Sequence, residues 1–279
     1  GRYEFRNKGI DIFLDALKQL AETDALDREV LVYITVPSAT TGPRKDLQAH
    51  LADENSPIDP KQNRFCTHYL EHPEWDQILN SIAGSVLANP SSKVKVVFVP
   101  TYLNGRDGIF DKSYYELLVG MDMTVFPSYY EPWGYTPLES TAFSVPTLTT
   151  TLAGFGLWAG SQGEHEGVTL VARNDDNYAE AAREIAKALL HFTKYTPQEV
   201  EIARNAAAEL SRTALWSELY AAYEKAYSEA IERSVTRTNR AVLNDGGGAT
   251  EQINFVRQQL ITEKPHWNRV MVEKVLPKR

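Results

Sequence analysis

The sequence predicts an α/β fold in which a parallel, doubly wound sheet is flanked by helices. Short apolar runs rich in β-branched residues alternate with segments of helical spacing, an order typical of βαβ units. The expected strands are residues 29–36, 94–99, 121–126, 144–151 and 167–172. Their apolar runs are continuous rather than alternating, which indicates strands buried on both faces of the sheet.

The first half of the chain supplies two of these strands. Residues 10–20 form the first expected helix, with apolar side chains at helical spacing: Ile10, Phe13, Leu14, Leu17 and Leu20. Residues 37–92 are polar and helix-prone, and turn signals such as Thr41-Gly42-Pro43 interrupt them. The strand at 94–99 ends at Pro100, and a short helix is expected at 114–118.

The second half becomes helical after the last strand. Gly154-Phe155-Gly156 is interpreted as a tight turn, with close approach of the backbone to a ligand as the alternative. Helices are expected at 177–192, 197–210 and 213–233. The last of these carries an aromatic stripe that predicts core packing: Trp216, Leu219, Tyr220, Tyr223 and Tyr227. We expect one Rossmann-like domain over residues 1–243, then a flexible break and a C-terminal helical extension over 244–279.

Composition limits the class of protein. The 279 residues are 43% hydrophobic and 24% charged, which is ordinary for a globular protein with a sizeable core. A net charge of -8 argues against general binding to nucleic acid or anionic membranes. The lone Cys66 excludes an internal disulfide and fits a reducing, cytoplasmic compartment. No apolar run approaches the ~18 residues of a membrane span.

One stretch concentrates functional side chains, the segment V-F-P-S-Y-Y-E-P-W-G-Y-T-P-L-E at residues 125–139. A strand ends at Pro127 and leads to Glu131. Thr136 is the expected helix N-cap with Pro137 at the first helical position, which puts Glu139 in the first turn. The free amides of such a helix start form a phosphate site. An ordinary strand-to-helix connection is the alternative interpretation.

Other candidate residues lie at the same edge of the expected sheet. Arg2 and Lys8 precede the first helix, where cations are unfavourable for stability but favourable for an anion. Tyr114 precedes a strand and could stack on a flat ligand, although packing is its commoner role. Surface cations are equally ordinary in loops. Cys66, His68 and His72 are interpreted as incidental groups on a helix surface rather than a metal site.

Five segments in this order resemble a known family: G-R-Y-E-F-R-N-K-G at 1–9, C-T-H at 66–68, V-K-V-V-F-V-P at 94–100, the motif at 126–139, and V-P-T-L-T-T at 145–150 followed by G-F-G. The chain resembles the C-terminal, donor-binding half of a glycogen synthase of the animal and fungal type (glycosyltransferase family 3), of which some bacteria carry versions. The similarity runs from Gly1 to about Ser228. The first and fourth segments together are highly specific.

The resemblance implies a GT-B enzyme, in which two Rossmann-like domains enclose the active site. Such an enzyme transfers glucose from a nucleotide sugar to the 4-hydroxyl of an α-1,4-glucan with retention of configuration. Arg2 and Lys8 would bind the donor diphosphate, and Glu131 would lie nearest the donor sugar. Neither a metal nor a cofactor is implied, because cations and helix amides can stabilise the departing nucleoside diphosphate.

The same resemblance assigns the nucleotide contacts. Tyr114 would stack on the base, Thr136 with the amides of Gly134 and Tyr135 would hold the phosphate, and Glu139 would contact the ribose. UDP-glucose is the favoured donor, but a tyrosine stacks on any base, so an ADP-glucose-using transferase is the nearest alternative. A non-catalytic nucleotide-sugar-binding module and a structural domain without ligand are further alternatives.

Two departures from the family pattern matter. The chain opens at Gly1 without Met, so we expect a fragment that lacks the N-terminal domain and its share of the site. The family's arginine-rich helix for glucose-6-phosphate corresponds here to residues 203–216, which hold only Arg204 and Arg212. A constitutive, unregulated enzyme is therefore expected. The final ~40 residues either cross back to the other domain or mediate assembly into a homo-oligomer.

Overall fold

The structure, a computed structural model, describes residues 1–244, and side chains up to residue 237. The chain divides into two compact units, Gly1–Ala214 and Leu215–Arg279. Of the second unit only the residues up to 244 are described, so the predicted break and extension at 244–279 lie outside the described residues, and the predicted boundary there stays a prediction.

The first unit contains all five predicted strands, and all of them pair in parallel. Strand β1 (Val30–Thr35) pairs with β4 (Val94–Val99), with Val30 opposite Val94 and Thr35 opposite Val99. Strands β5 (Thr124–Phe126), β6 (Thr147–Thr150) and β7 (Val168–Val171) form a second sheet in that order. The predicted α/β fold of parallel strands flanked by helices is confirmed.

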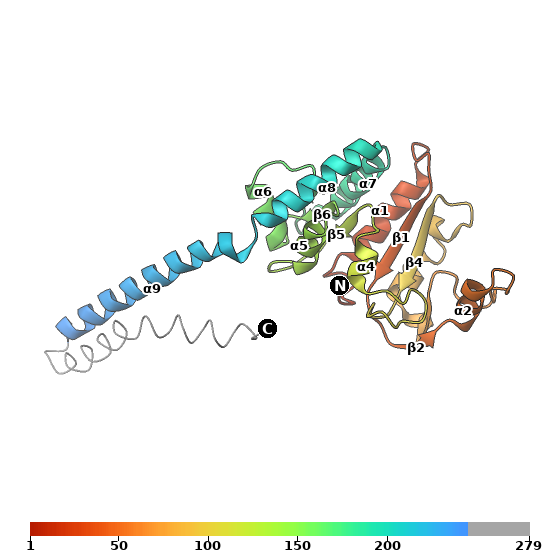
Figure 1. The fold of residues 1–279 in the computed structure, drawn as a ribbon, viewed down its shortest axis with the longest axis horizontal. Helices are drawn as coiled ribbons and strands as arrows, with labels where there is room; N and C mark the ends of the chain where they lie inside the picture. The colour runs from red at the N-terminus through yellow and green to blue at the C-terminus, as the bar shows by residue number, and fades with distance from the viewer. Residues whose placement is uncertain (245–279) are drawn as a thin grey trace. The chain divides into compact units, whose positions relative to one another are not determined.

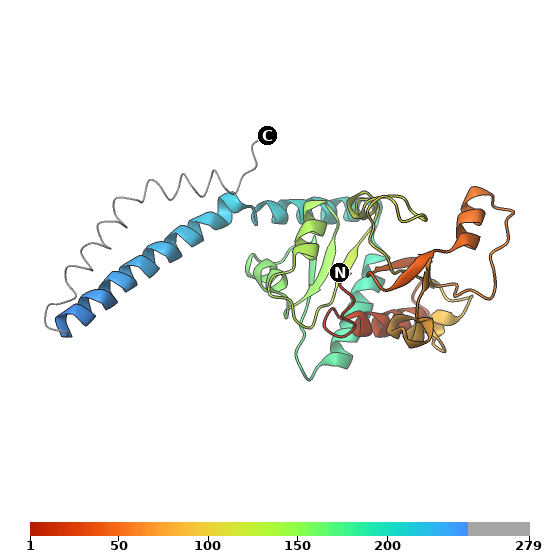
Figure 2. The same cartoon turned by 90° about the horizontal axis from the view of Figure 1, so that it is seen from below.

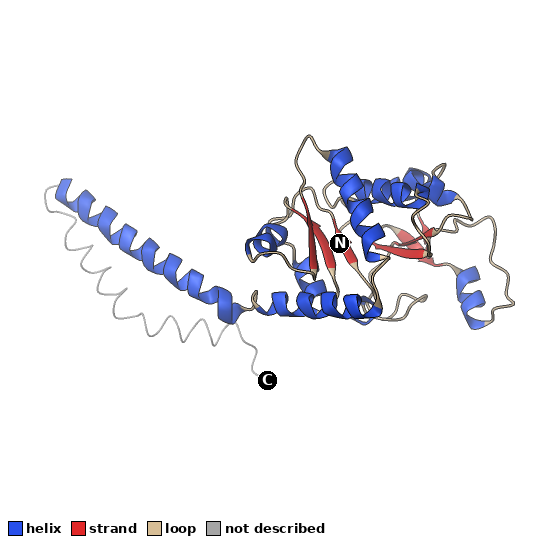
Figure 3. Cartoon of the chain, turned by 90° about the horizontal axis from the view of Figure 1, so that it is seen from above, coloured by secondary structure: helices blue, strands red, loops and turns tan. Residues whose placement is uncertain are grey.

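The predicted single sheet is instead two sheets, which Figures 1 and 3 show as separate groups of strands. Within the described residues, β1 pairs only with β4 and β5 only with β6. Strands β1 and β5 are therefore edge strands of their respective sheets. Helix α1 (Ile10–Glu22) joins the sheets by packing on each: Leu14 and Leu17 belong to the β1–β4 core, whereas Ile12 and Ala16 belong to the β6–β7 core.

The region between β1 and β4 is more varied than its polar, helix-prone sequence predicts. Strand β2 (Thr40–Pro43) pairs antiparallel with β3 (His68–Leu70), and the other elements are short: α2 (Lys45–Ala52), the 3-10 helix η1 (Pro73–Trp75), α3 (Gln77–Ile82) and the 3-10 helix η2 (Val86–Ala88). Arg44, 2% exposed, donates to the carbonyl oxygens of Asn63 and Cys66 and so ties this region together. Such tertiary contacts leave no periodic pattern in the sequence.

Helices cover both faces of the β5–β6–β7 sheet. Figure 2 shows α8 on one side of these strands and α1 with α7 (Tyr178–Phe192) on the other. On the α8 side, α5 (Tyr135–Ala142), α6 (Gly154–Ser161) and α8 (Pro197–Arg212) share a small core with Val168 of β7: Phe155, Trp158, Ala159, Leu138 and Leu210.

The predicted turn at residues 154–156 is wrong, because these residues begin helix α6. The two glycines are needed for close packing: a Cβ at Gly154 would overlap the carbonyl oxygen of Pro132, and one at Gly156 would overlap that of Thr150. The glycines thus bring the helix against the protein's own backbone rather than against a ligand.

The second unit begins with a long helix, α9 (Trp216–Asn244), which continues past the predicted end at residue 233. Its predicted role in core packing is wrong for the larger side chains, since Trp216 is 69% exposed and Tyr227 59%. Leu219 is half-buried. Through the described part of the chain, every helix is too short or too polar to cross a bilayer.

Candidate functional site

The candidate site lies where strands β5, β6 and β7 end. Because the three strands are parallel, the segments after Phe126, Thr150 and Val171 leave the sheet at one edge. The N-terminal segment 1–9 reaches the same edge, since the amide of Tyr129 donates to the carbonyl oxygen of Asn7 at 2.8 Å. Two segments more than a hundred residues apart in the sequence are therefore joined at the strand ends.

Gly9 is required at this junction. Its φ of 69° lies in the left-handed region, and a Cβ there would overlap the carbonyl oxygen of Pro127. The residue caps the start of α1, so the helix begins immediately after the contact with Pro127. The predicted loop before the first helix is thereby fixed against the end of β5.

The centre of the site is an ion pair between Lys8 and Glu131. The Lys8 ammonium contacts Oε2 of Glu131, and the two side chains are 18% and 23% exposed. Local bonds place each partner: the Lys8 amide donates to the Glu4 carbonyl at 2.8 Å, and the Gly154 amide donates to the Glu131 carbonyl at 2.9 Å. The structure therefore brings together two predicted site residues, and the half-buried setting leaves both reachable from solvent.

Helix α5 begins beside this pair. Gly134, with φ of 107°, is the N-cap, so the predicted N-cap at Thr136 is wrong, and Tyr135 is the first helical residue. Pro137 fits the third helical position because that residue has no intrahelical donor to lose. Glu131 packs over the cap, with Cγ 3.4 Å from where a Gly134 Cβ would lie. The unpaired amides of the first turn hence lie next to the ion pair.

Glu139 lies one turn along α5 rather than in its first turn, because the helix starts a residue earlier than predicted. It accepts a hydrogen bond of 3.1 Å from the hydroxyl of Tyr115, whose ring stacks on Phe143 at 5.0 Å. The predicted Tyr114 is adjacent, and its ring meets that of Tyr115 edge-on. Burial, with a smaller effect from the Glu139 charge, raises the pKa of Tyr114 to about 12.

Tyr115 is a residue that the sequence prediction missed. Helix α4 (Tyr114–Leu118) is fixed by a capping box between Ser113 and Glu116, which sets the direction of both tyrosines. The signal was available, because two consecutive tyrosines at a helix start point to different sides of the helix. One of the pair is half-buried and the other, 43% exposed, reaches Glu139.

Arg2 is not brought into the cluster. Its side chain is 80% exposed, and Nε lies 3.2 Å from Oε1 of Glu4. Asn7 donates to the other oxygen of that carboxylate at 2.6 Å, and this hydrogen bond, more than the charges of Arg2 and Lys8, lowers the pKa of Glu4. Arg2 would have to leave Glu4 to reach an anion beside Lys8.

The cysteine and histidines near residue 70 do not lie on a helix surface, as predicted: Cys66 forms an isolated β-bridge with Phe98, His68 begins strand β3, and His72 directly precedes the 3-10 helix η1. Cys66 and His68 are buried, and both ring nitrogens of His68 are engaged, with Thr67 Oγ1 at 2.9 Å and the Asp107 carbonyl at 2.9 Å. Burial raises the pKa of the Cys66 thiol to about 11. His72 stacks on Trp75. Throughout residues 1–244, no three potential metal-binding side chains gather.

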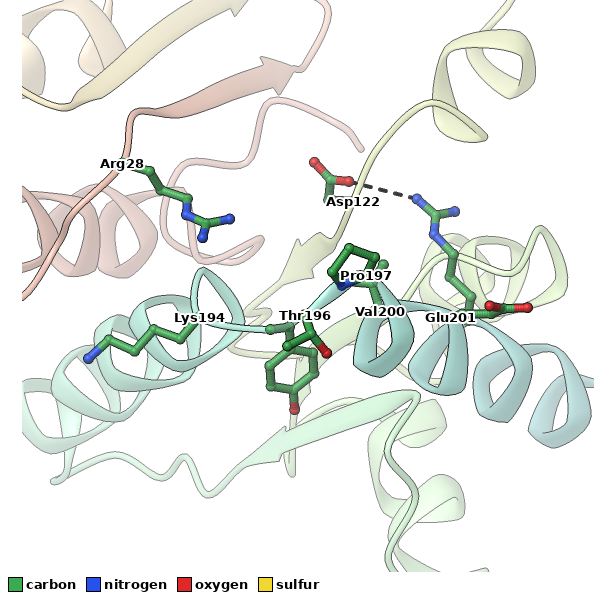
Figure 4. A pocket seen from close by; sticks show the side chains of 9 residues that line it. Arg28, Asp122, Lys194, Thr196, Pro197, Val200 and Glu201 are labelled. Atoms are coloured by element: carbon green, nitrogen blue, oxygen red, sulfur yellow. Dashed lines mark ion pairs between the residues drawn. The ribbon is translucent and has the colours of Figure 1, made fainter.

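A surface cavity of about 710 Å³ lies elsewhere in the first unit (Figure 4). Arg28 and Asp122 line it, and both precede strands, so the cavity is at the opposite ends of the strands from the candidate site. Arg204 pairs there with Asp122 at 4.0 Å and donates to the Met121 carbonyl at 2.6 Å. The start of α8 carries a capping box of Thr196 and Glu199, which satisfies the amides of these two residues.

Parallel strands that end at an ion pair and at the free amides of a helix are characteristic of α/β domains that bind anionic ligands. A family model described as "Glycogen synthase" matches residues 48–275. Because the match covers well over half of the 279 residues, the chain belongs to the glycogen synthase family.

Curated relatives of the animal and fungal type agree with this assignment. Glycogen [starch] synthase of Neurospora crassa is 28% identical in an alignment 291 residues long. This alignment covers 84% of this chain and 41% of the relative. The liver glycogen [starch] synthase of Homo sapiens is 29% identical over 290 residues, with 84% and 41% covered. The chain thus spans about two fifths of the length of these relatives.

Solved structures of glycosyltransferases are more distantly similar. A glycosyltransferase from Rickettsia africae aligns with a TM-score of 0.44 at 16% identity, covering 81% of this chain and 45% of that one. Sucrose-phosphate synthase from Thermosynechococcus elongatus aligns with a TM-score of 0.39 at 18% identity, covering 82% and 52%.

Proposed function

We propose that this chain is the donor-binding half of a glycogen synthase with the GT-B fold, a cytoplasmic enzyme. It transfers glucose from a nucleotide sugar, UDP-glucose in preference to ADP-glucose, to the 4-hydroxyl at the end of an α-1,4-glucan, with retention of configuration. The acceptor and part of the donor are held by a second domain that this chain does not contain.

The observation that carries this proposal is the Lys8–Glu131 pair beside the N-terminus of α5. A cation and helix amides together suit a diphosphate, whose terminal phosphate gains a second negative charge when the glycosidic bond to glucose breaks. A carboxylate beside them suits the sugar, whose anomeric carbon becomes positive in the transition state. Membership of the glycogen synthase family gives the glucosyl donor as the ligand with both parts.

Each residue has a distinct task in this reaction. Lys8 neutralises the charge that develops on the leaving phosphate, and Glu131 stabilises the oxocarbenium-like sugar. We favour displacement on one face of the sugar, in which the acceptor hydroxyl attacks as the nucleoside diphosphate leaves and passes its proton to the leaving phosphate oxygen. The exchange of one glycosidic bond for another is then balanced without a metal.

The nucleoside contacts follow from the second cluster of the site. Tyr114 presents a ring for the base, and Glu139, one turn along α5, accepts from ribose hydroxyls in place of Tyr115. Thr136 and the amides of Gly134 and Tyr135 hold the phosphate at the helix start. Arg2 turns from Glu4 to the diphosphate when the donor binds.

The test is calorimetric titration of this chain with UDP and with ADP, without metal, beside Lys8→Ala and Arg2→Ala variants. We expect metal-independent binding of a nucleoside diphosphate that each substitution weakens by about tenfold, the value of one charge-assisted hydrogen bond. The nucleotide that binds with the higher affinity identifies the base of the donor. Lys61→Ala, at an exposed position, is the matched control and leaves the affinity unchanged.

Unchanged affinity in Lys8→Ala would contradict the proposed role of the ion pair. If wild-type chain binds neither nucleotide, the same variants are tested in the full-length protein by transfer of labelled glucose to glycogen. Transfer that survives the Lys8→Ala substitution would overturn the proposal.

A further inference from the structure

Arg173 is a buried cation that no motif in the sequence singles out. It follows β7, and its side chain is 6% exposed. Its backbone is fixed to the end of β6, because its amide donates to Thr151 Oγ1 at 3.0 Å and its carbonyl accepts from the same hydroxyl at 3.2 Å. The guanidinium therefore starts from a rigid base at the edge of the sheet where the candidate site lies.

The guanidinium contacts both segments that build the site. Its Nη1 donates to the carbonyl oxygen of Pro127, the residue that follows β5 and precedes the segment of Glu131. Its Cζ lies 5.2 Å from the ring centroid of Tyr129, a cation–π contact. The same Nη1 lies 3.0 Å from where a Cβ of Gly9 would be, next to Lys8. Arg173 thus touches the junction at which the Lys8 and Glu131 segments meet.

No direct ion pair offsets the burial of Arg173. Within residues 1–244, no carboxylate lies within ion-pair distance of Arg173. Burial lowers the pKa of its guanidinium, and the nearest titratable groups that oppose the shift are Asp11, Tyr178 and Tyr129. Burying a cation without a direct counter-ion costs stability, and an apolar side chain would fill the space more favourably.

We propose that Arg173 is a positioning residue that sets the separation of the Lys8 and Glu131 segments by holding the Pro127 carbonyl and the Tyr129 ring. Its consequence for ligand binding rests on the proposed function. In the proposed function, Lys8 faces the terminal phosphate of a nucleoside diphosphate. Displacing the segment that carries Lys8 therefore weakens binding of a nucleoside diphosphate, whereas binding of a nucleoside monophosphate is unchanged. Only a planar guanidinium reaches the Pro127 carbonyl and the Tyr129 ring at once, so a lysine cannot replace Arg173.

The experiment compares wild-type chain with Arg173→Gln, Arg173→Lys and the control Arg183→Gln, which alters an exposed arginine of α7. Amide exchange is read at Tyr129, whose amide bonds Asn7, and at Leu148 in the central strand β6. Calorimetry gives the affinities for UDP and UMP. We expect exchange at Tyr129 to quicken at least tenfold in both Arg173 variants while Leu148 is unchanged. The Kd for UDP rises about tenfold and that for UMP less than twofold, the loss of one charge-assisted contact.

Wild-type exchange at Tyr129 in both variants would overturn the positioning role. So would faster exchange at Tyr129 and Leu148 together, or equal losses for UDP and UMP, because either result means that Arg173 stabilises the whole domain. Retention of wild-type behaviour by Arg173→Lys would mean that charge alone is required and would also overturn it. If wild-type chain binds no nucleotide, the affinities for UDP and UMP are measured in the full-length protein, and the exchange data on this chain still decide the positioning role.

Discussion

Two ion pairs in this chain have similar charges and different surroundings. Arg44 and Asp46 pair through two parallel hydrogen bonds of 3.1 and 2.5 Å, and their side chains are 2% and 11% exposed. Arg44 also donates to two carbonyl oxygens, and Asp46 accepts from the amide of Asp59 at 3.0 Å. Nearly every donor and acceptor of this pair is used by the protein itself.

The Lys8–Glu131 pair is open by comparison. A single contact joins the two side chains, and within residues 1–244 we find no second hydrogen bond to either charged group. The ammonium has three donors and the carboxylate about four acceptor positions, so most of that capacity is available to a ligand. The Arg44–Asp46 pair therefore has the contacts of a pair that stabilises the fold, whereas the Lys8–Glu131 pair has the free bonding capacity that the proposed function requires.

The largest effect is expected from breaking the saturated pair. Arg44→Met leaves Asp46 and two carbonyl oxygens without their donor, which lowers the free energy of unfolding by about 3 kcal/mol or more. Urea unfolding followed by circular dichroism measures it, with Lys45→Met at the exposed neighbour as control. Nucleotide affinity is unchanged. A loss below about 1 kcal/mol would place this pair with ordinary surface pairs.

Glu131→Gln should reverse this pattern. In the full-length enzyme we expect turnover to fall at least about 100-fold, because a neutral amide no longer stabilises the positive sugar. Nucleotide affinity stays near normal, and the free energy of unfolding changes by less than about 1 kcal/mol, as for other solvent-accessible pairs. Initial-rate measurements with glycogen as acceptor provide the test, and Glu164→Gln is the exposed control. Near-wild-type turnover would refute the role given to Glu131.

The meeting of Lys8 and Glu131 could be predicted because it depends on topology. Parallel strands deliver their following loops to one edge, and the prediction that the loop before α1 lies at the same edge places its cation near a carboxylate that follows β5. The division into two sheets could not be predicted, because continuous apolar runs reveal strands but not their partners. The exposed aromatic stripe of α9 shows the same limit, since spacing reveals a face of a helix but not what covers it.

The other site predictions failed because they depend on local backbone conformation, on side-chain rotamers or on long-range contacts. The cap of α5 depends on the positive φ of Gly134, and a Gly two residues before a Thr leaves both as candidates. The side chain of Arg2 points to Glu4, and the spacing of residues in a sequence does not determine such a rotamer. Arg173 is buried by contact with Pro127, 46 residues away, and an isolated arginine after a strand carries no signal of such a contact.

A smaller, pH-dependent effect is expected at the saturated pair. The hydrogen bond from Arg44 lowers the pKa of Asp46 from 3.8 to about 2. A lowered pKa in the folded state stabilises the protein above the unfolded-state pKa, and this stabilisation disappears as pH falls toward 2. The difference in unfolding free energy between wild type and Asp46→Asn should therefore shrink by about 2 kcal/mol between pH 5 and pH 2. Asp24→Asn, at an exposed position, is the control for removal of one surface charge. A difference in unfolding free energy between wild type and Asp46→Asn that stays constant from pH 5 to pH 2 would contradict the coupling to Arg44.

The smallest effect concerns regulation, and it extends the comparison of open and saturated cations to helix α8. Arg204 donates to the carbonyl oxygens of Met121 and Ser144 and lies beside Asp122, so it resembles Arg44 more than Lys8. Arg212, the other arginine of α8, is the last residue of the helix. Alanines occupy the middle of the intervening stretch, at residues 206–208. We expect glucose-6-phosphate to leave the rate of the full-length enzyme unchanged within about twofold, because helix α8 presents no cluster of unpaired cations to its phosphate. Initial rates with and without glucose-6-phosphate, at donor concentrations below KM, measure the effect. A several-fold rise would mean that Arg204 gives up its carbonyl partners to the effector, and Arg204→Gln would then abolish the rise without changing the basal rate.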